Sequence, residues 1–214
     1  IKFSRNFNQP LGSSLDNCTA LTHLIFGDWF NQPLDNSLNN CTVLTHLTFG
    51  YEFNQPLANS LNNCALLTYV EFGYHFDQPL DDFLNVHPSL VSLGLGYNFN
   101  QKLELPLNIL SLSLNSNNRN YGDYLPNSIV ELELGVDFDL ELCNLPSSIE
   151  KITFDKWSEY NRELNCLPNG LLILKLPAGY DKQISLIPRS LTELICGEDY
   201  PYHKDFAHVK VVFL

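Results

Sequence analysis

Histidine and glutamate side chains stand at matching places in this sequence and could together do acid–base or metal chemistry. His23 and His46 are one 23-residue repeat apart, and Glu71 lies in the next repeat. Imidazole titrates near neutral pH and binds metals, and a carboxylate beside it could take part in proton transfer. The competing interpretation is a solvated strand face. We favour the strand face, because catalysis needs a pocket as well as titratable groups.

Cysteines form a second set of residues that could do chemistry. Cys18, Cys41 and Cys64 share one repeat position, and His87 takes that position in the next repeat. Three Cys and one His are a zinc ligand set. Parallel strands are about 4.8 Å apart, so one ligand per coil would place the outer pair about 14 Å apart, too far for one ion. We therefore predict a ladder of free thiols that pack as small apolar groups, with no metal. Oxidation of one neighbouring pair is left open.

The element that carries all these positions is a repeat. Phe-Asn-Gln-Pro-Leu occurs at 7–11, 30–34 and 53–57, and variants follow at 76–80 and 99–103. Fixed periods of about 20–50 residues mark solenoids, propellers or arrays. Alternating apolar pairs have the period of a β-strand. They occur at ten places: Ile1/Phe3, Leu24/Phe26, Leu47/Phe49, Val70/Phe72, Leu93/Leu95, Leu112/Leu114, Leu132/Leu134, Ile152/Phe154, Leu174/Leu176 and Leu194/Cys196.

The second half uses a shorter unit. Leu-Pro or Ile-Pro motifs precede its strands, at 125–129, 145–149, 167–171 and 187–191. The stretch Asn115–Tyr124 breaks the pattern and is expected to be an irregular loop. We predict one solenoid over 1–214. It has regular 23-residue repeats over 1–110, shorter repeats of 20–22 residues over 111–200 and a C-terminal cap over 201–214.

The predicted fold class is α/β or mainly β. We expect a right-handed, leucine-rich-repeat-like solenoid with a parallel concave sheet of about ten strands and little helix. The convex side should be extended or 3-10, because the segments between strands are too short for long helices. Gly27, Gly50, Gly73 and Gly96 are expected to end strands and start turns.

A column of asparagines allows two interpretations. Its members are Asn8, Asn31, Asn54, Asp77 and Asn100, with Asp139, Asn161 and Asp181 at later positions. A polar binding groove would use such side chains. A structural ladder would use them to bond the backbone of a tight turn and of the next coil, which suits both Asn and Asp. We predict the ladder, because buried polar groups are paired.

Positions that flank the buried strand residues are the candidate partner-binding surface. They include His23, His46, Tyr69 and Glu71 on the strands. Just beyond the strands come Tyr51, Tyr74, Tyr97 and Asp28. Exposed aromatic side chains anchor many interfaces, but stacked tyrosines also pack on one another along a solenoid. Both interpretations of the tyrosine column are open.

Charge and motifs exclude several functions. Asp plus Glu number 24 against 12 Lys plus Arg, a net charge of −12. This argues against nucleic acid or an anionic membrane as partner and suits a basic protein. No apolar run reaches the roughly 18 residues of a membrane span. No phosphate-binding loop, nucleophile elbow or zinc-protease motif is present, so we predict no enzyme activity and no cofactor.

The repeat resembles a known family. The unit L-T-x-L-x-F-G-x-x-F-N-Q-P-L is similar to the FNIP repeat, a relative of the leucine-rich repeat, and the similarity covers essentially the whole chain. That family is typical of social amoebae and of giant viruses that infect amoebae, where the repeats can follow an F-box. The resemblance implies an intracellular protein, in the host cytoplasm if viral. It also implies a protein–protein interaction module, with substrate choice for a ubiquitin ligase if an F-box precedes the repeats. The alternatives are an enzyme or metal-binding protein that uses the His/Glu cluster, and an architectural spacer.

Both ends of the chain lack a neighbouring coil in this sequence. It opens at Ile1 inside a repeat and contains no Met, so we expect a fragment or processed form. Ile1–Phe3 would be an edge strand, and Val209–Leu214 is an apolar run that could cap the solenoid. Uncovered edges invite pairing with another chain, so self-association through either segment is the expected alternative contact.

Overall fold

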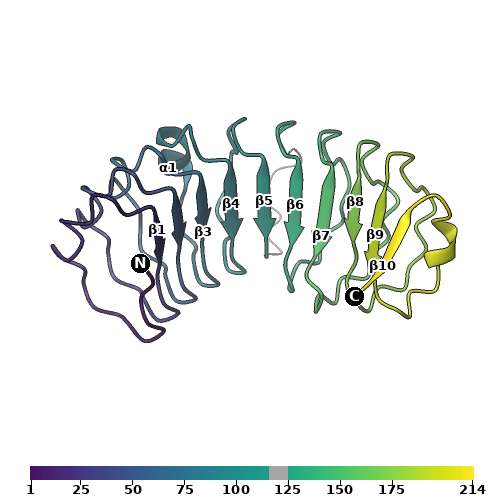
Figure 1. Ribbon diagram of the computed structural model, residues 1–214, viewed down its shortest axis with the longest axis horizontal. Helices are drawn as coiled ribbons and strands as arrows, with labels where there is room; N and C mark the ends of the chain where they lie inside the picture. The colour runs from purple at the N-terminus through teal and green to yellow at the C-terminus, as the bar shows by residue number, and fades with distance from the viewer. Residues whose placement is uncertain (116–124) are drawn as a thin grey trace. The chain divides into compact units, whose positions relative to one another are not determined.

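Short parallel strands recur once per repeat in the computed structural model, which describes residues 1–115 and 125–214 (Figure 1). The chain divides into a first unit, Ile1–Ile109, and a second unit, Leu110–Leu214. This division lies beside the expected change of repeat length. The irregular loop expected at Asn115–Tyr124 lies, apart from Asn115, outside the described residues.

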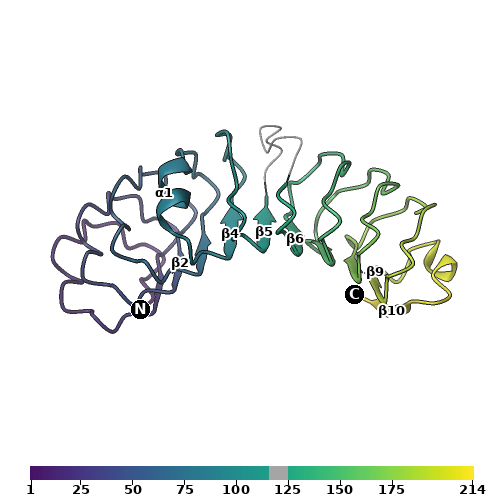
Figure 2. The ribbon, with the colours of Figure 1, turned by 90° about the horizontal axis from the view of Figure 1, so that it is seen from above.

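The first unit contains β1 (His23–Ile25), β2 (His46–Thr48), β3 (Tyr69–Glu71), α1 (Asp81–Val86) and β4 (Ser92–Leu95). Each strand pairs in parallel with the next, and the central residues Leu24, Leu47, Val70 and Leu93 are in register. All four are fully buried. Strand residues alternate between the two faces of a sheet, so the residues on either side of each buried one point outward. The helix α1 lies on the side of its coil away from the strands (Figure 2).

The second unit contains β5 (Ser111–Leu114), β6 (Glu131–Leu134), β7 (Lys151–Phe154), β8 (Ile173–Lys175), β9 (Glu193–Cys196), η1 (His203–Asp205) and β10 (Lys210–Phe213). Its strands also pair in parallel with their neighbours in chain order. The solenoid of ten parallel strands with little helix is therefore confirmed. Two of its details differ from expectation. Ile1–Phe3 supplies only an isolated bridge, Lys2 to Ile25, and the tenth strand is β10 near the C-terminus.

Stacked phenylalanine rings form the core of the first unit. One column contains Phe3, Phe26, Phe49 and Phe72, with ring centroids 5.2–5.5 Å apart. The motif phenylalanines form the other column, Phe7, Phe30, Phe53, Phe76 and Phe99, at 6.0–6.2 Å. Rings of the two columns also meet within each of the first four coils, with centroids 3.9–4.4 Å apart. The buried Phe and Leu of the repeated motif therefore pack inside the coil.

The glycines after the strands start turns as expected, since the carbonyl of each accepts the N–H of the phenylalanine three residues later, and close packing of the coils requires them as well. A Cβ added to Gly50 would lie 2.1 Å from the carbonyl oxygen of Gly27, and one added to Gly73 would lie 2.0 Å from that of Gly50. Neither residue has a positive φ angle. Consecutive coils approach each other so closely here that no side chain fits between them.

Left-handed backbone appears instead after the motif leucines. Gly12, Asp35 and Ala58 occupy equivalent places in successive repeats, with φ angles of 51°, 45° and 43°. Glycine adopts this conformation without strain, and Asp tolerates it better than Ala does. Ala58 is therefore a strained residue in the turn of its coil.

Candidate interaction surface

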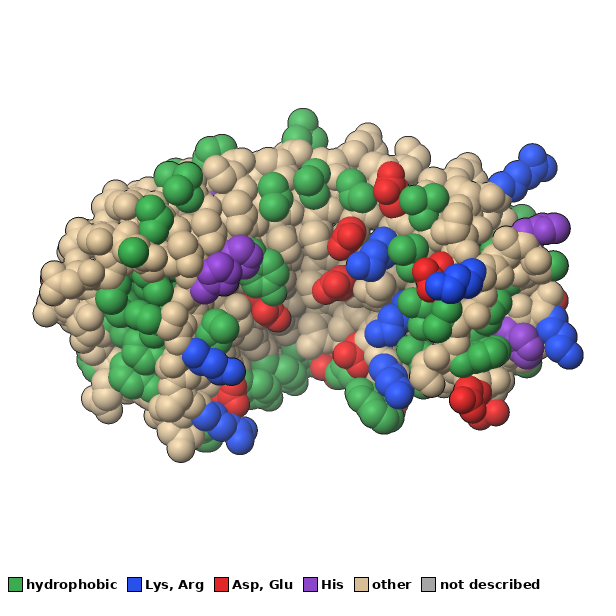
Figure 3. Space-filling model, viewed as in Figure 1, with side chains coloured by type: hydrophobic (Ala, Val, Ile, Leu, Met, Phe, Trp, Pro, Cys, Tyr) green, Lys and Arg blue, Asp and Glu red, His purple; other side chains and the backbone are tan. Residues whose placement is uncertain are grey.

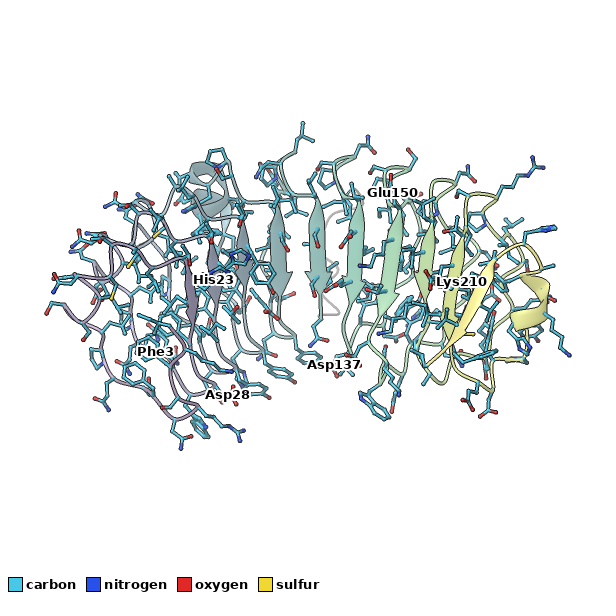
Figure 4. The ribbon with its side chains drawn as sticks, viewed as in Figure 1. Phe3, His23, Asp28, Asp137, Glu150 and Lys210 are labelled. Carbon is cyan, nitrogen blue, oxygen red and sulfur yellow. The ribbon has the colours of Figure 1, made fainter. Side chains whose placement is uncertain are left out.

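The outward face of β1–β3 carries a row of stacked rings, which we call the His–Tyr row: His23, His46 and Tyr69. The strand register places these residues side by side. The ring centroids of His23 and His46 are 4.2 Å apart, and those of His46 and Tyr69 are 5.6 Å apart. Histidine side chains gather at this place on the surface (Figure 3), and His23 lies over β1 (Figure 4). The row is thus held by its own stacking on a solvent-facing surface.

Threonines fix the orientation of the histidine rings. The Thr45 hydroxyl donates to the Thr22 carbonyl at 3.0 Å and lies 2.9 Å from His46 Nδ1. A hydroxyl has one proton to give, so Nδ1 of His46 carries the hydrogen of that second contact. His23 makes the matching contact with Thr22 at 3.0 Å. Burial, and then the neighbouring His23, lower the pKa of His46, which favours its neutral form. Sequence reasoning missed this threonine column, although the recurrent Leu-Thr pair signals it.

Glu71 is held by Tyr69 and not by histidine. The Tyr69 hydroxyl donates to Glu71 Oε2 at 2.8 Å. Gly94 lies opposite Glu71 on β4, and a Cβ there would be 3.0 Å from Glu71 Cγ. The structure therefore brings His23 and His46 together, whereas Glu71 is held by a hydrogen bond from Tyr69. Within residues 1–115 and 125–214, no group of three or more His, Cys, Asp or Glu side chains could hold a metal ion.

Beyond the ends of the strands runs the Tyr row: Tyr51, Tyr74 and Tyr97. Their ring centroids are 4.7 and 4.9 Å apart, and the rings are stacked within 15° of parallel. Tyr51 is 46% exposed and Tyr97 is 36% exposed. The edge of His75 packs against Tyr51 and Tyr74. The ring faces thus stabilise the coils while part of each end ring remains open to solvent.

Asp28 occupies the place of the Tyr row in the preceding coil (Figure 4). It forms an ion pair with Arg5 at 2.8 Å, and both side chains are well exposed. Exposed ion pairs of this kind contribute about 0–1 kcal/mol to stability. Next to it, Trp29 is 55% exposed. The sequence prediction included Asp28 but missed Arg5, which comes from the incomplete first repeat.

The asparagine column is joined coil to coil. We call Asn8, Asn31, Asn54, Asp77 and Asn100 the Asn ladder. Each Oδ1 of its first four members accepts the backbone N–H of the next member, at 2.8–3.0 Å. The same oxygen accepts a second hydrogen bond from the following glutamine, Gln32, Gln55, Gln78 or Gln101, at 2.9–3.0 Å. These glutamines were not anticipated, and their place beside Asn in the motif is the signal for them.

The polar residues at the corresponding positions of the second unit make less uniform hydrogen bonds. Arg162 donates to both carboxylate oxygens of Asp139, at 2.7 and 2.8 Å. This hydrogen bonding to Arg162 lowers the pKa of Asp139. The Asp181 backbone N–H donates to Asn161 Oδ1 at 3.2 Å. The pattern in which one side-chain oxygen accepts hydrogen bonds from two donors recurs regularly in the first unit.

The cysteine column faces the interior. Cys41 and Cys64 are buried, Cys18 is half-buried, and all three are free thiols. Cys64 Sγ lies 3.8 Å from the Leu38 carbonyl oxygen. His87 follows in this column, with Nδ1 2.7 Å from the Phe83 carbonyl and Nε2 3.0 Å from the Leu61 carbonyl. Both ring nitrogens thus face backbone oxygens and are not directed at a thiol.

The outward face of the second unit is charged where that of the first is aromatic. Acidic and basic side chains both gather on this face (Figure 3). Lys151 lies 3.5 Å from Glu131, and Lys210 lies 3.1 Å from Glu193. The outward strand position thus carries aromatic rings in one unit and paired charges in the other. The side chain at this position varies between repeats, whereas the buried strand position stays apolar.

Comparison with known proteins finds a family match within the second unit. Residues 121–156 match the family described as FNIP Repeat. The chain carries an FNIP repeat. A crystal structure described as CroV588, a novel circular LRR protein from a giant virus, is similar with a TM-score of 0.67 and 32% identity. The aligned region covers 93% of this chain and 30% of that chain. No curated protein matches. None of the helices described here is of a length and apolarity that would cross a membrane.

Proposed function

We propose that this FNIP-repeat chain is a protein-binding module, and that the first unit makes the contact through the His–Tyr row, Glu71 and the Tyr row. The leucine-rich-repeat type of solenoid fits a protein-interaction module. The observation that carries the finer proposal is the ordered stack of His23, His46 and Tyr69 on an outward strand face.

Preorganised rings suit a contact surface. Binding orders rotamer-rich side chains at about 0.5–1.5 kcal/mol each, and rings that are already stacked avoid much of that penalty. Tyrosine anchors are enriched at interfaces because they bury a large apolar area and still make a polar contact. Glu71 beside the His–Tyr row and Glu52 near the Tyr row give this surface acidic groups, and the chain has a net charge of −12. A partner with a basic patch would therefore complement it.

A pull-down from an amoebal cell lysate tests the proposal. The test variant combines Glu71→Lys with Tyr74→Ala. The control variant is Leu66→Ala, because Leu66 is exposed, apolar and outside both rows. We expect the test variant to lose a partner that the wild type and the control retain, while circular dichroism shows that all three are folded. Equal recovery of the same partner with the folded test variant would place the contact elsewhere, and no partner for any variant would favour a spacer.

A narrower role as the substrate-selecting part of a ubiquitin ligase rests on the FNIP resemblance and needs an F-box outside residues 1–214. Co-purification of the full-length protein with a ubiquitin-ligase scaffold would test it. The enzyme or metal-binding alternative is less well supported, because Tyr69 lies between His46 and Glu71 and engages both.

A further inference from the structure

Two exposed cysteines of the second unit lie in contact. Cys143 is in the connection between β6 and β7, and Cys166 is in the connection between β7 and β8. Their Sγ atoms are 3.8 Å apart, and both are free thiols on the surface. They come from neighbouring coils but not from one position of a fixed-length repeat. The contact between the two cysteines is therefore created by the fold and not by the period of the repeat.

The other cysteines are less exposed to solvent. Cys41, Cys64 and Cys196 are buried, and burial raises the pKa of the Cys64 thiol to about 12. A thiolate is the reactive form of cysteine, and it must also be reached by its reagent. Cys143 and Cys166 alone among the six cysteines combine exposure with a thiol neighbour in contact.

We propose that Cys143 and Cys166 form a modification site that takes a small-molecule disulfide as co-substrate and becomes an intramolecular disulfide. An S–S bond is about 2.05 Å long, so the two sulfurs must approach by roughly 1.8 Å. Disulfides span Cα separations of about 4.4–6.8 Å, and the two cysteines come from neighbouring coils with their sulfurs already in contact. Both cysteines lie in surface connections outside the strands, where side-chain rotation can supply the approach.

The hydrogen bond between the thiols orders the two steps. Cys143 donates to Cys166 Sγ, and this bond raises the pKa of Cys143. The Cys143 thiol proton is engaged in this bond and Cys166 Sγ is its acceptor, so we assign the first attack to Cys166. Its thiolate breaks the S–S bond of the reagent, forms a mixed disulfide and releases one reagent thiol. Cys143, after losing its proton, then attacks Cys166 Sγ and releases the second reagent thiol. Two cysteine thiols are oxidised, one reagent disulfide is reduced to two thiols, and the two cysteine protons end on those thiols.

The product would join two consecutive coils outside the sheet. This inference is independent of the proposed partner surface, which belongs to the first unit. Failure of one therefore leaves the other intact.

Redox titration of the full chain with glutathione buffers of increasing oxidised fraction tests the site. Free thiols are trapped by alkylation, and peptide mapping locates the disulfides. We expect one peptide pair linked through Cys143 and Cys166, with the mass of two hydrogens lost and four of the six cysteines still alkylated. The Cys18→Ser control should form the same link. Cys166→Ser should leave Cys143 either reduced or joined to glutathione.

Three results would overturn the proposal. Both cysteines could stay reduced at oxidant ratios that oxidise a small dithiol. Stable glutathione adducts could accumulate on both without a link. The link could join two chains, which size exclusion under non-reducing conditions would reveal. Each outcome is read on the folded wild-type protein, so none depends on the stability of a variant.

Discussion

Replacement of Asn54 by leucine should destabilise the first unit measurably. Asn54 Oδ1 accepts the Asp77 backbone N–H at 2.9 Å and Gln78 Nε2 at 3.0 Å. Leucine has nearly the same size but no acceptor, so both donors lose their partner. Each hydrogen bond contributes about 0.5–1.5 kcal/mol net, which gives about 1–3 kcal/mol for the pair. A loss near 2 kcal/mol lowers the melting temperature of a chain of this length by at least about 4 °C.

The chain supplies its own control for this substitution. Asp77 holds the same place in the next coil, and its Oδ1 accepts the Asn100 N–H at 2.8 Å and Gln101 Nε2 at 2.9 Å. Asn54→Asp should therefore keep most of the stability, with a small penalty from the added charge near Asp77. Gln78→Ala removes one of the two hydrogen bonds at Asn54 and should have about half the effect of leucine. Thermal melts followed by circular dichroism compare the three variants. An unchanged melt for Asn54→Leu, or an equal loss for Asn54→Asp, would refute the ladder.

Four further substitutions give distinct outcomes. Ala58 has a φ angle of 43°, so Ala58→Gly should relieve strain and stabilise by about 0.5–1 kcal/mol, which would raise the urea midpoint. The buried Tyr160 hydroxyl has no hydrogen-bond partner among the described residues, whereas that of Tyr180 donates to a backbone carbonyl at 3.1 Å. Tyr180→Phe should therefore lose about 1 kcal/mol in the same unfolding assay, and Tyr160→Phe should be neutral or stabilising. The pKa of His46 is lowered from 6.5 by burial and by His23. The stability that comes from keeping His46 neutral is thus present above the ordinary histidine pKa and declines as pH falls through it. An NMR titration should show that His23→Gln raises the pKa of His46.

The period of the sequence was enough to predict the coil. Buried positions repeat every 23 residues in the first unit, and a period-two pair in each repeat can only be a strand with one buried face. The same logic located His23, His46 and Tyr69 on the outward face, since they flank Leu24, Leu47 and Val70. Register follows from equal repeat length, so side chains at one repeat position become neighbours in space.

Features that break the period could not be predicted in this way. The repeats of the second half differ in length, so counting along the chain does not show that Cys143 and Cys166 meet. The bond from Tyr69 to Glu71 depends on side-chain rotation within one strand, and only coordinates show it. Gly50 starts a turn as the sequence predicts, but the close approach of the neighbouring coil to this glycine shows only in the structure.

The chain ends illustrate a further limit. Ile1 and Phe3 have the alternation of a strand, yet the pairing with β1 amounts to one bridge, Lys2 to Ile25, with backbone hydrogen bonds between Phe3 and Ile25 and between Ile25 and Ile1. Lys210–Phe213 forms a strand despite its different motif, because β9 offers it an unpaired edge.

A saturation mutagenesis library scored in parallel for folding and for partner capture would test most directly whether motif residues build the coil and outward residues make the contact. Folding is scored by protease resistance, and capture by retention of the partner isolated with the wild-type chain. Substitutions of Phe53, Asn54 and Leu57 should lower capture only as far as they lower folding. Substitutions of His23, Tyr69, Glu71 and Tyr74 should reduce capture while folding is retained. Capture losses at folded variants that cluster away from the His–Tyr and Tyr rows, or at the motif positions themselves, would contradict this assignment.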